Sequence, residues 1–190
     1  DIISKANNYA FLKSTYPPLT PPAWTSIATG VHPGMHSIWS FTDLDKGFVE
    51  TIHRSRYPII WEILDTVHVK SVWLWFPFSY PAPTLTHGIF VVGDPLTKDL
   101  IYSSSKDLIS APKNHIVCLN KIRPQIEELY FASANENPSL SQMLKTLELR
   151  YEIVNQFLEN GSFNVIFGVF METDRIIHYS SNESDIKLIY

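Results

Sequence analysis

An apolar run, Phe163-Asn164-Val165-Ile166-Phe167-Gly168-Val169-Phe170-Met171, leads directly into the polar segment Glu172-Thr173-Asp174-Arg175-Ile176-Ile177-His178. The run is rich in Val, Ile and Phe and is apolar on both faces, which predicts a central strand covered by helices on each side. Ligands of open α/β sheets bind at the carboxyl ends of such strands. The two segments therefore predict an α/β fold, with a candidate site in the polar residues after the strand.

The preceding part of the chain shows the alternation of helix and strand that is typical of a doubly wound sheet. Pro58 is expected to open a helix from Ile59 to Val67, and a strand from Lys70 to Phe76 follows it. A second strand is expected from Gly88 to Val92. We therefore predict a doubly wound mixed sheet between helices. The apolar face of the expected helix consists of Ile59, Ile60, Ile63 and Leu64.

The clearest helix of the sequence runs from Pro138 to Glu159. Asn137 is a plausible cap at its start, and Gly161 suits its end. Apolar residues recur along it at helical spacing, so we expect them to form a stripe that faces the core. The stripe consists of Leu140, Met143, Leu144, Leu147, Tyr151, Val154 and Leu158.

The remaining segments carry weaker patterns. Residues 1–10 are consistent with the tail of a helix, residues 115–119 with a strand and residues 124–132 with a short helix. A loop-rich stretch of about 80–135 is a candidate cap or insertion. With 190 residues, the chain suits one α/β domain over residues 1–190 and is not clearly long enough for two.

A proline-rich segment, Tyr16-Pro17-Pro18-Leu19-Thr20-Pro21-Pro22, precedes an expected helix from Ala23 to Thr29. Pro22 suits a first helical turn, and Gly30 suits the position after the last one. Thr20 is thus expected in a stiff loop just before a helix whose free N–H groups face a bound phosphoryl group. By itself a threonine before proline is also an ordinary extended loop residue, and a functional one needs a base or a metal to activate its hydroxyl.

Asp174 and His178 lie one helical turn apart, so their side chains project from the same side of a helix and can chelate one cation. Zinc and similar ions accept this mixture of carboxylate and imidazole ligands. The alternative interpretation, a surface ion pair or a helix cap with an unrelated histidine, stays open. The other histidines without a partner at ligand spacing are interpreted as surface or packing residues: His53, His68, His87 and His115.

Composition limits the classes of partner. A net charge of −4 argues against binding to a nucleic-acid polymer through a basic surface. Cys118 is the only cysteine, which excludes an internal disulfide and a four-cysteine zinc site. No apolar run reaches the roughly 20 residues that span a bilayer. A small anionic substrate would need a local positive centre such as a metal ion, and the oligomeric state and localisation stay open.

Residues 14–41, which include Leu19-Thr20-Pro21-Pro22-Ala23-Trp24-Thr25-Ser26-Ile27-Ala28-Thr29-Gly30, resemble the nucleophile segment of microbial type I phosphodiesterase/nucleotide pyrophosphatase proteins. This family belongs to the alkaline phosphatase superfamily. Residues 173–178 are similar to its second motif, a Thr-Asp-Arg-x-x-His run after a central strand. The likeness covers essentially the whole chain and implies an alkaline phosphatase-like fold, with residues 1–190 as a partial catalytic domain.

The resemblance implies roles for three residues. Thr20 matches the nucleophile, which also contacts one of two divalent metal ions, commonly zinc and alternatively manganese. Asp174 and His178 match two ligands of the other ion. The implied reaction is hydrolysis of a small phosphoester, a phosphodiester or a phosphomonoester, through a phosphorylated threonine that water activated at a metal later hydrolyses.

Departures from the family pattern limit these expectations. The family's other ligands, an Asp and then an Asp-His pair and a further His, would precede residue 1 and follow residue 190. We therefore expect an incomplete metal site and little hydrolysis by this chain alone. Ala23 replaces an Asn of the nucleotide pyrophosphatase branch, and His36 is interpreted mainly as structural. The alternative is a catalytically silent α/β binding module or a truncated fragment, whereas Thr20 argues against sulfatase chemistry, which uses a modified Cys or Ser.

Overall fold

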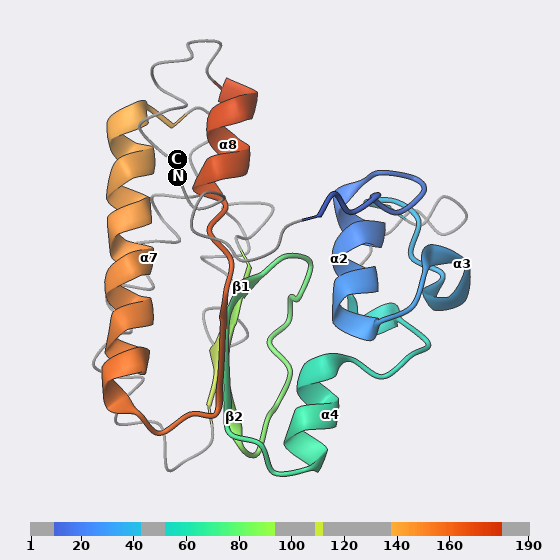
Figure 1. Ribbon diagram of the computed structural model, residues 1–190, viewed down its shortest axis with the longest axis horizontal. Helices are drawn as coiled ribbons and strands as arrows, with labels where there is room; N and C mark the ends of the chain where they lie inside the picture. Colours follow the sequence, from blue (N-terminus) through green and yellow to red (C-terminus); the bar gives the residue numbers. More distant parts are fainter. Residues whose placement is uncertain (1–9, 43–51, 94–108, 112–137, 180–190) are drawn as a thin grey trace. The chain divides into compact units, whose positions relative to one another are not determined.

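A computed structural model describes residues 10–42, 52–93, 109–111 and 138–179 (Figure 1). The chain forms two compact units, Asp1–Tyr57 and Pro58–Tyr190. The expected helix tail in residues 1–10, strand 115–119 and helix 124–132 lie almost wholly or wholly outside the described residues. Most of the candidate cap at about 80–135 lies outside them too, so the cap and the single-domain assignment stay predictions.

The first unit contains helix α2 (Thr20–Thr29), the short helix α3 (Pro33–His36) and a 3-10 turn, η1 (Ile52–Arg54). Helix α2 begins at Thr20, so the expectation that Thr20 precedes the helix is wrong by one turn. Prolines fit this first turn because the N–H groups they lack would have no helical partner there. As expected, Gly30 ends the helix with a φ of 72°, and its N–H donates to Ser26 O at 2.9 Å.

The second unit contains a mixed sheet of four described strands in the order β3-β2-β1-β4. Strand β1 (Ser71–Phe76) pairs in parallel with both β2 (Gly88–Val92) and β4 (Val165–Gly168), and β3 (Ile109–Ser110) is antiparallel to β2. The predictions of β1 and β2 are confirmed. Strand β4 is shorter than predicted, and among the described residues it lies at the edge of the sheet and is only partly buried, so these residues do not confirm the expectation of a central strand.

Helices cover both faces of this sheet, which confirms the predicted α/β class. Figure 1 shows α4 (Ile60–Thr66) on one face and α7 (Leu140–Asn160) on the other. Helix α8 (Glu172–Tyr179) follows β4 and lies beside α7. The carboxyl end of a parallel strand therefore leads into the helix that carries Asp174 and His178, as the sequence predicts.

An aromatic cluster packs α4 against the sheet. The ring of Trp61, which is fully buried, makes edge contacts with Trp73, Phe76 and Phe90 at centroid distances of 5.4, 5.0 and 4.9 Å. The predicted apolar face of α4 is wrong in part, because Ile63 is 47% exposed. The predicted face consists of aliphatic residues, whereas the larger Trp61, two positions before Ile63, fills the core.

Strand β1 contains one extra residue near its end. The pairing with β2 shifts between Leu74 and Phe76, and Trp75 adopts a φ of 61°, which is unusual for a bulky side chain. Phe76 shares the α4 side of the sheet with Trp73, since both contact Trp61. Trp75 instead contacts Arg150 of α7 on the opposite side. The bulge thus gives large rings to both faces.

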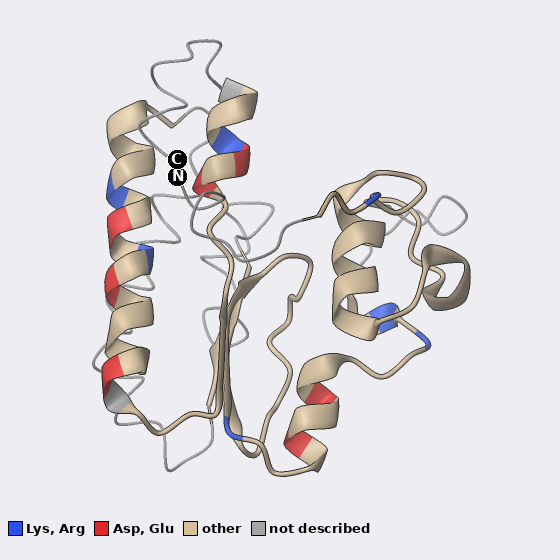
Figure 2. Ribbon diagram, in the orientation of Figure 1, with Lys and Arg blue, Asp and Glu red and all other residues tan. Residues whose placement is uncertain are grey.

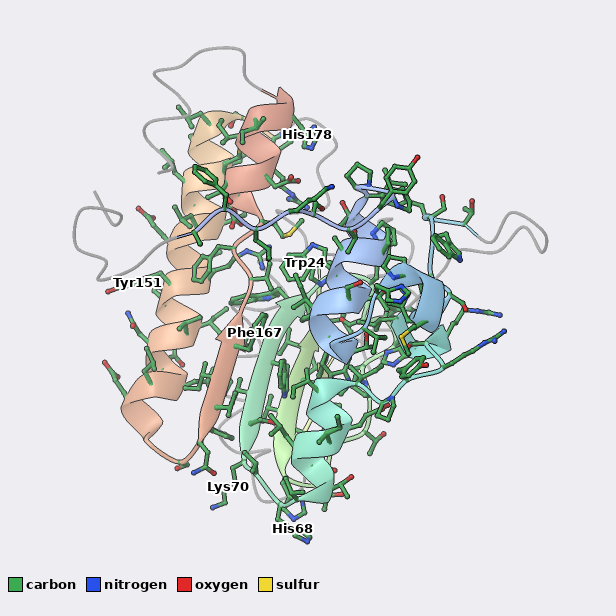
Figure 3. All side chains as sticks on the ribbon, turned by 45° about the vertical axis from the view of Figure 1, so that its right-hand side comes forward. Trp24, His68, Lys70, Tyr151, Phe167 and His178 are labelled. Atoms are coloured by element: carbon green, nitrogen blue, oxygen red, sulfur yellow. The ribbon has the colours of Figure 1, made fainter. Side chains whose placement is uncertain are left out.

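Helix α7 is rotated relative to the predicted stripe. Ser139, not Asn137, caps it through a reciprocal box with Gln142. Tyr151, which Figure 3 shows pointing away from the sheet, and Leu158 are 63% and 57% exposed. At the start of the helix the prediction is confirmed, because Met143 is buried and Leu140 and Leu144 pack against its cluster. Farther along, the buried residues Thr146, Arg150, Ile153 and Phe157 each lie one position before a predicted residue, which is a rotation of about 100°. The hydrophobic pattern did not identify this buried face, because the face includes the polar residues Thr146 and Arg150.

No helix in the described part of the chain combines the length and the apolar character that crossing a bilayer requires.

The rotation of α7 predicts which of its apolar residues stabilise the fold. Ile153→Ala removes a fully buried side chain and should lower the free energy of unfolding by about 2–5 kcal/mol. Leu158→Ala, the control on the exposed side of the same helix, should change it by no more than about 0.5 kcal/mol. Urea unfolding followed by circular dichroism measures both, and a larger loss in Leu158→Ala would contradict the observed rotation.

Candidate functional site

Asp174 and His178 face each other on α8. His178 Nε2 lies 3.6 Å from Asp174 Oδ1, and the two side chains are 70% and 62% exposed. Figure 3 shows His178 near the end of α8, on the side away from α7. An oxygen and a nitrogen at this separation, on one helix face and open to solvent, fit two ligands of one cation. The same geometry also makes a surface ion pair when the imidazole is protonated.

The opposite face of α8 holds the helix in place. Ile176 is 1% exposed and packs against Met143 of α7. Glu172, the first residue of α8, is completely buried. Successive helical residues are rotated by about 100°, so Glu172 and Ile176 lie on one side and Asp174 and His178 on roughly the opposite side. The inward face therefore sets the direction in which the two candidate ligands project.

The charges of α8 also suit its direction. Glu172 and Asp174 lie in the first turn and His178 lies in the last, where the helix dipole favours negative and positive charge respectively. Figure 2 shows acidic residues gathered at the start of α8 and charges of both signs along α7. Within residues 10–42, 52–93, 109–111 and 138–179, no group of three or more His, Cys, Asp or Glu side chains is arranged to hold a metal ion. Asp174 and His178 therefore form a pair of candidate ligands and not a group of three.

Thr20, the candidate nucleophile, is the first residue of α2 in the first unit and is half-buried. Leu19 precedes it without a side-chain cap. The next two positions are Pro21 and Pro22, which have no N–H, and the N–H of Ala23 already donates to Leu19 O at 3.1 Å. Among the first three residues of α2, only Thr20 therefore keeps an N–H for a ligand.

The expectation that several free N–H groups of this helix face a bound phosphoryl group is therefore wrong. That expectation followed from a helix over Ala23 to Thr29, whereas the observed helix begins at Thr20 and places both prolines where the donors would be. A helix end with one donor offers an anion little stabilisation. A phosphoryl group bound near Thr20 would therefore need positive charge from other groups for most of its stabilisation.

His36 connects α2 to α3. It is fully buried, its Nε2 lies 3.0 Å from Ser26 Oγ, and its Nδ1 accepts from the N–H of Ile38 at 3.1 Å. Since Nδ1 accepts a hydrogen bond, the proton of the neutral ring lies on Nε2. Burial lowers the pKa of His36, a hydrogen bond to the carbonyl of Pro22 opposes this, and nearby His32 lowers it further. This is the structural role expected for His36.

A second group of titratable side chains lies at the amino ends of β1 and β2. Asp65 accepts hydrogen bonds from the N–H groups of Thr86 and His87 at 3.0 and 2.6 Å, and His68 Nδ1 lies 3.0 Å from His87 Nε2. His68 and His87 have no partner at ligand spacing in the sequence and were interpreted as surface or packing residues, and the fold brings these two rings into contact with each other. Burial tends to raise the pKa of Asp65, and the two N–H donors and His87 outweigh it and lower that pKa. These contacts tie the end of α4 to the start of β2.

Sequence patterns missed Arg150 as a residue near the site. Arg150 is fully buried on α7 and contacts Glu172, the residue two positions before Asp174. Glu172 lies in the polar segment directly after β4, and this position could have identified it as a candidate site residue. Nothing in the local pattern distinguishes Arg150 from the exposed charged residues of the same helix.

The family model described as "Type I phosphodiesterase / nucleotide pyrophosphatase" matches residues 1–187. Comparisons with curated proteins and with solved structures give no match. The family match covers both segments on which the sequence resemblance depends.

The buried imidazole of His36 predicts a dependence of stability on pH. Because the folded pKa lies below the ordinary value of about 6.5, the stability contribution is complete above about pH 6.5 and is lost as pH falls through the folded pKa. NMR titration of the His36 ring should give a pKa below that of the same ring in denaturing urea. The urea midpoint of His36→Gln should fall less on acidification than that of the parent chain. A folded pKa of His36 at or above its urea value would contradict the buried neutral ring.

Proposed function

The chain belongs to the type I phosphodiesterase/nucleotide pyrophosphatase family, and from this premise we propose a metal-dependent phosphoester hydrolase in which Thr20 is the nucleophile. Phosphoester hydrolysis is the chemistry of the family. We propose that Asp174 and His178 bind one divalent cation, zinc or alternatively manganese, and that the substrate is a small phosphodiester or phosphomonoester. We keep residues of about 80–135 as a proposed cap or insertion of this catalytic domain.

The geometry of Asp174 and His178 carries the proposal. Two ligand atoms that each lie about 2.1 Å from a tetrahedral ion are roughly 3.4 Å apart. The observed separation of 3.6 Å between Asp174 Oδ1 and His178 Nε2 is close to this value. A cation can therefore replace the contact between the two side chains with little rearrangement of either one. Their exposure leaves room for further ligands and for a substrate.

The first turn of α2 supports a role for a cation near Thr20. A divalent cation supplies positive charge that lowers the proton affinity of a hydroxyl and stabilises phosphoryl oxygens. With prolines at the second and third positions of α2, the helix cannot supply this charge through its own N–H groups. The residues beside Thr20 thus support dependence on a metal, as membership of the family does.

The proposed reaction has two displacements. Thr20 Oγ1 attacks phosphorus as its proton is lost, the bond from phosphorus to the leaving alcohol breaks, and the alcohol leaves with a proton. Water then attacks the phosphorylated threonine, the bond from phosphorus to Thr20 Oγ1 breaks, and the hydroxyl regains a proton. The net reaction consumes one water for each ester bond. Ala23 gives no support for a nucleotide as the preferred substrate.

A catalytically silent binding module is the second candidate. The observation that favours it is the direct contact of Asp174 with His178, because an exposed pair of opposite charges needs no metal. The two candidates differ in whether Thr20 becomes phosphorylated and whether the pair binds a cation. Two experiments separate them.

The first experiment replaces Thr20 in the whole gene product. With Zn²⁺ or Mn²⁺ added, Thr20→Ala should lower kcat for an aryl phosphodiester by about a thousandfold or more, because no hydroxyl remains to attack phosphorus. Thr20→Ser keeps a hydroxyl and should retain measurable turnover. Mass spectrometry after an acid quench should find a phosphoryl adduct on Thr20 in the parent protein.

Helix content and thermal unfolding of Thr20→Ala should match those of the parent, so that lost turnover reports on chemistry. Full activity of a folded Thr20→Ala protein would remove Thr20 as the nucleophile.

The second experiment measures binding of Zn²⁺ to this chain by calorimetry. Asp174→Asn and His178→Ala should each lower the Zn²⁺ affinity by about tenfold or more, because even the loss of a residue that only supports a ligand has an effect of about this size. Ile177→Ala is the matched control, because Ile177 is on the same helix, is 57% exposed and is not a metal ligand. Equal affinities in all four proteins would contradict a metal site at Asp174 and His178 and favour the silent module.

A further inference from the structure

We propose that Arg150 and Glu172 form a positioning pair, which holds α8 so that Asp174 and His178 present their ligand atoms to one cation. The inference deepens the proposed function and rests on it. Arg150 Nε donates to Glu172 Oε1 at 2.8 Å, and the two side chains are 0% and 1% exposed. Glu172 is the first residue of α8, so this contact fixes the helix at the end that joins it to the sheet.

Arg150 connects three elements of the second unit to α7. Its guanidinium lies 4.6 Å from the ring centroid of Trp75 at the bulge of β1, and its Nη1 donates to the carbonyl of Val169, just after β4, at 3.5 Å. The guanidinium is planar and keeps its charge at every accessible pH, so these contacts define a direction as well as a distance. Glu172 is thereby held at a fixed place relative to two strands.

Two anchors on the inward face of α8 act together. Glu172 contacts Arg150 at the first turn, and Ile176 packs against Met143 one turn later. An apolar contact tolerates small rotations of the helix, whereas a short hydrogen bond between charged groups does not. The charged anchor therefore sets the rotation of α8, and the rotation sets where Asp174 and His178 point.

The buried ion pair of Arg150 and Glu172 is not expected to contribute much to the stability of the fold. Burying two charges carries a desolvation penalty, and well-packed apolar side chains of similar volume often stabilise a fold as well or better. Glu172 Oε2 is buried and has no hydrogen-bond partner in the described structure, which adds to that penalty. The pair therefore contributes less to the stability of the fold than apolar residues could. Its position beside the proposed ligands instead suits a role in positioning them.

The test replaces the pair with apolar residues, in the variant Arg150→Met/Glu172→Leu of this chain. Its stability toward urea should equal or exceed that of the parent, while its affinity for Zn²⁺, measured by calorimetry with the metal alone, should fall about tenfold. Amide hydrogen exchange across α8 in the metal-free chain should accelerate, although global stability is kept. Glu172→Asp, which keeps the charge, should recover more of the Zn²⁺ affinity than Glu172→Gln.

The control is Ile176→Val, which weakens the apolar anchor and leaves the charged one intact. It should lower stability and keep the Zn²⁺ affinity within about twofold of the parent. Zn²⁺ binding that depends on Asp174 and His178 but is equal in the parent and the double variant would overturn the positioning role alone. Absence of such binding in the parent would overturn the proposed metal site and this inference together.

Discussion

The ion pair between Arg150 and Glu172 is the contact through which the elements around the proposed metal ligands are connected. It joins the long helix α7 to the first residue of α8, and the same guanidinium lies over Trp75 of the central strand. Because both charges are fully buried, loss of either partner would leave the other without compensation in a low-dielectric interior. Helix, strand and candidate site are therefore constrained by one guanidinium.

Much of the fold could be predicted from sequence because it depends on local patterns. The apolar segments of β1 and β2 and the helix end at Gly30 have signals within a few residues, and the structure agrees with them. The orientation of α7 could not be predicted in this way. Its buried face includes Thr146 and Arg150, and the burial of Arg150 depends on Glu172, which is distant in sequence. A hydrophobic pattern assigns such residues to the surface and thus selects the neighbouring stripe.

The candidate site shows the same division. The spacing of Asp174 and His178 predicted a shared helix face, and their observed separation of 3.6 Å agrees with it. The surroundings of Thr20 were less predictable, because sequence patterns locate the start of a helix in a proline-rich segment only to within about a turn. The exact start determines whether Pro21 and Pro22 occupy the first turn, where other residues would offer free N–H groups. His36 adds a constraint of another kind, since its two ring nitrogens connect α2 to the segment after α3. Partners of this kind follow from tertiary packing and have no sequence spacing of their own.

The extra residue in β1 changes how the strand must be numbered. In a regular strand, odd and even positions belong to opposite layers, but beyond Trp75 this parity is reversed, and Phe76 joins the layer of Trp73. Deleting Trp75 would restore regular alternation and keep Phe76 in the layer of Trp73, but it would remove the indole that contacts the guanidinium of Arg150. Comparisons between relatives that assume strict alternation would exchange the two layers from this position onward.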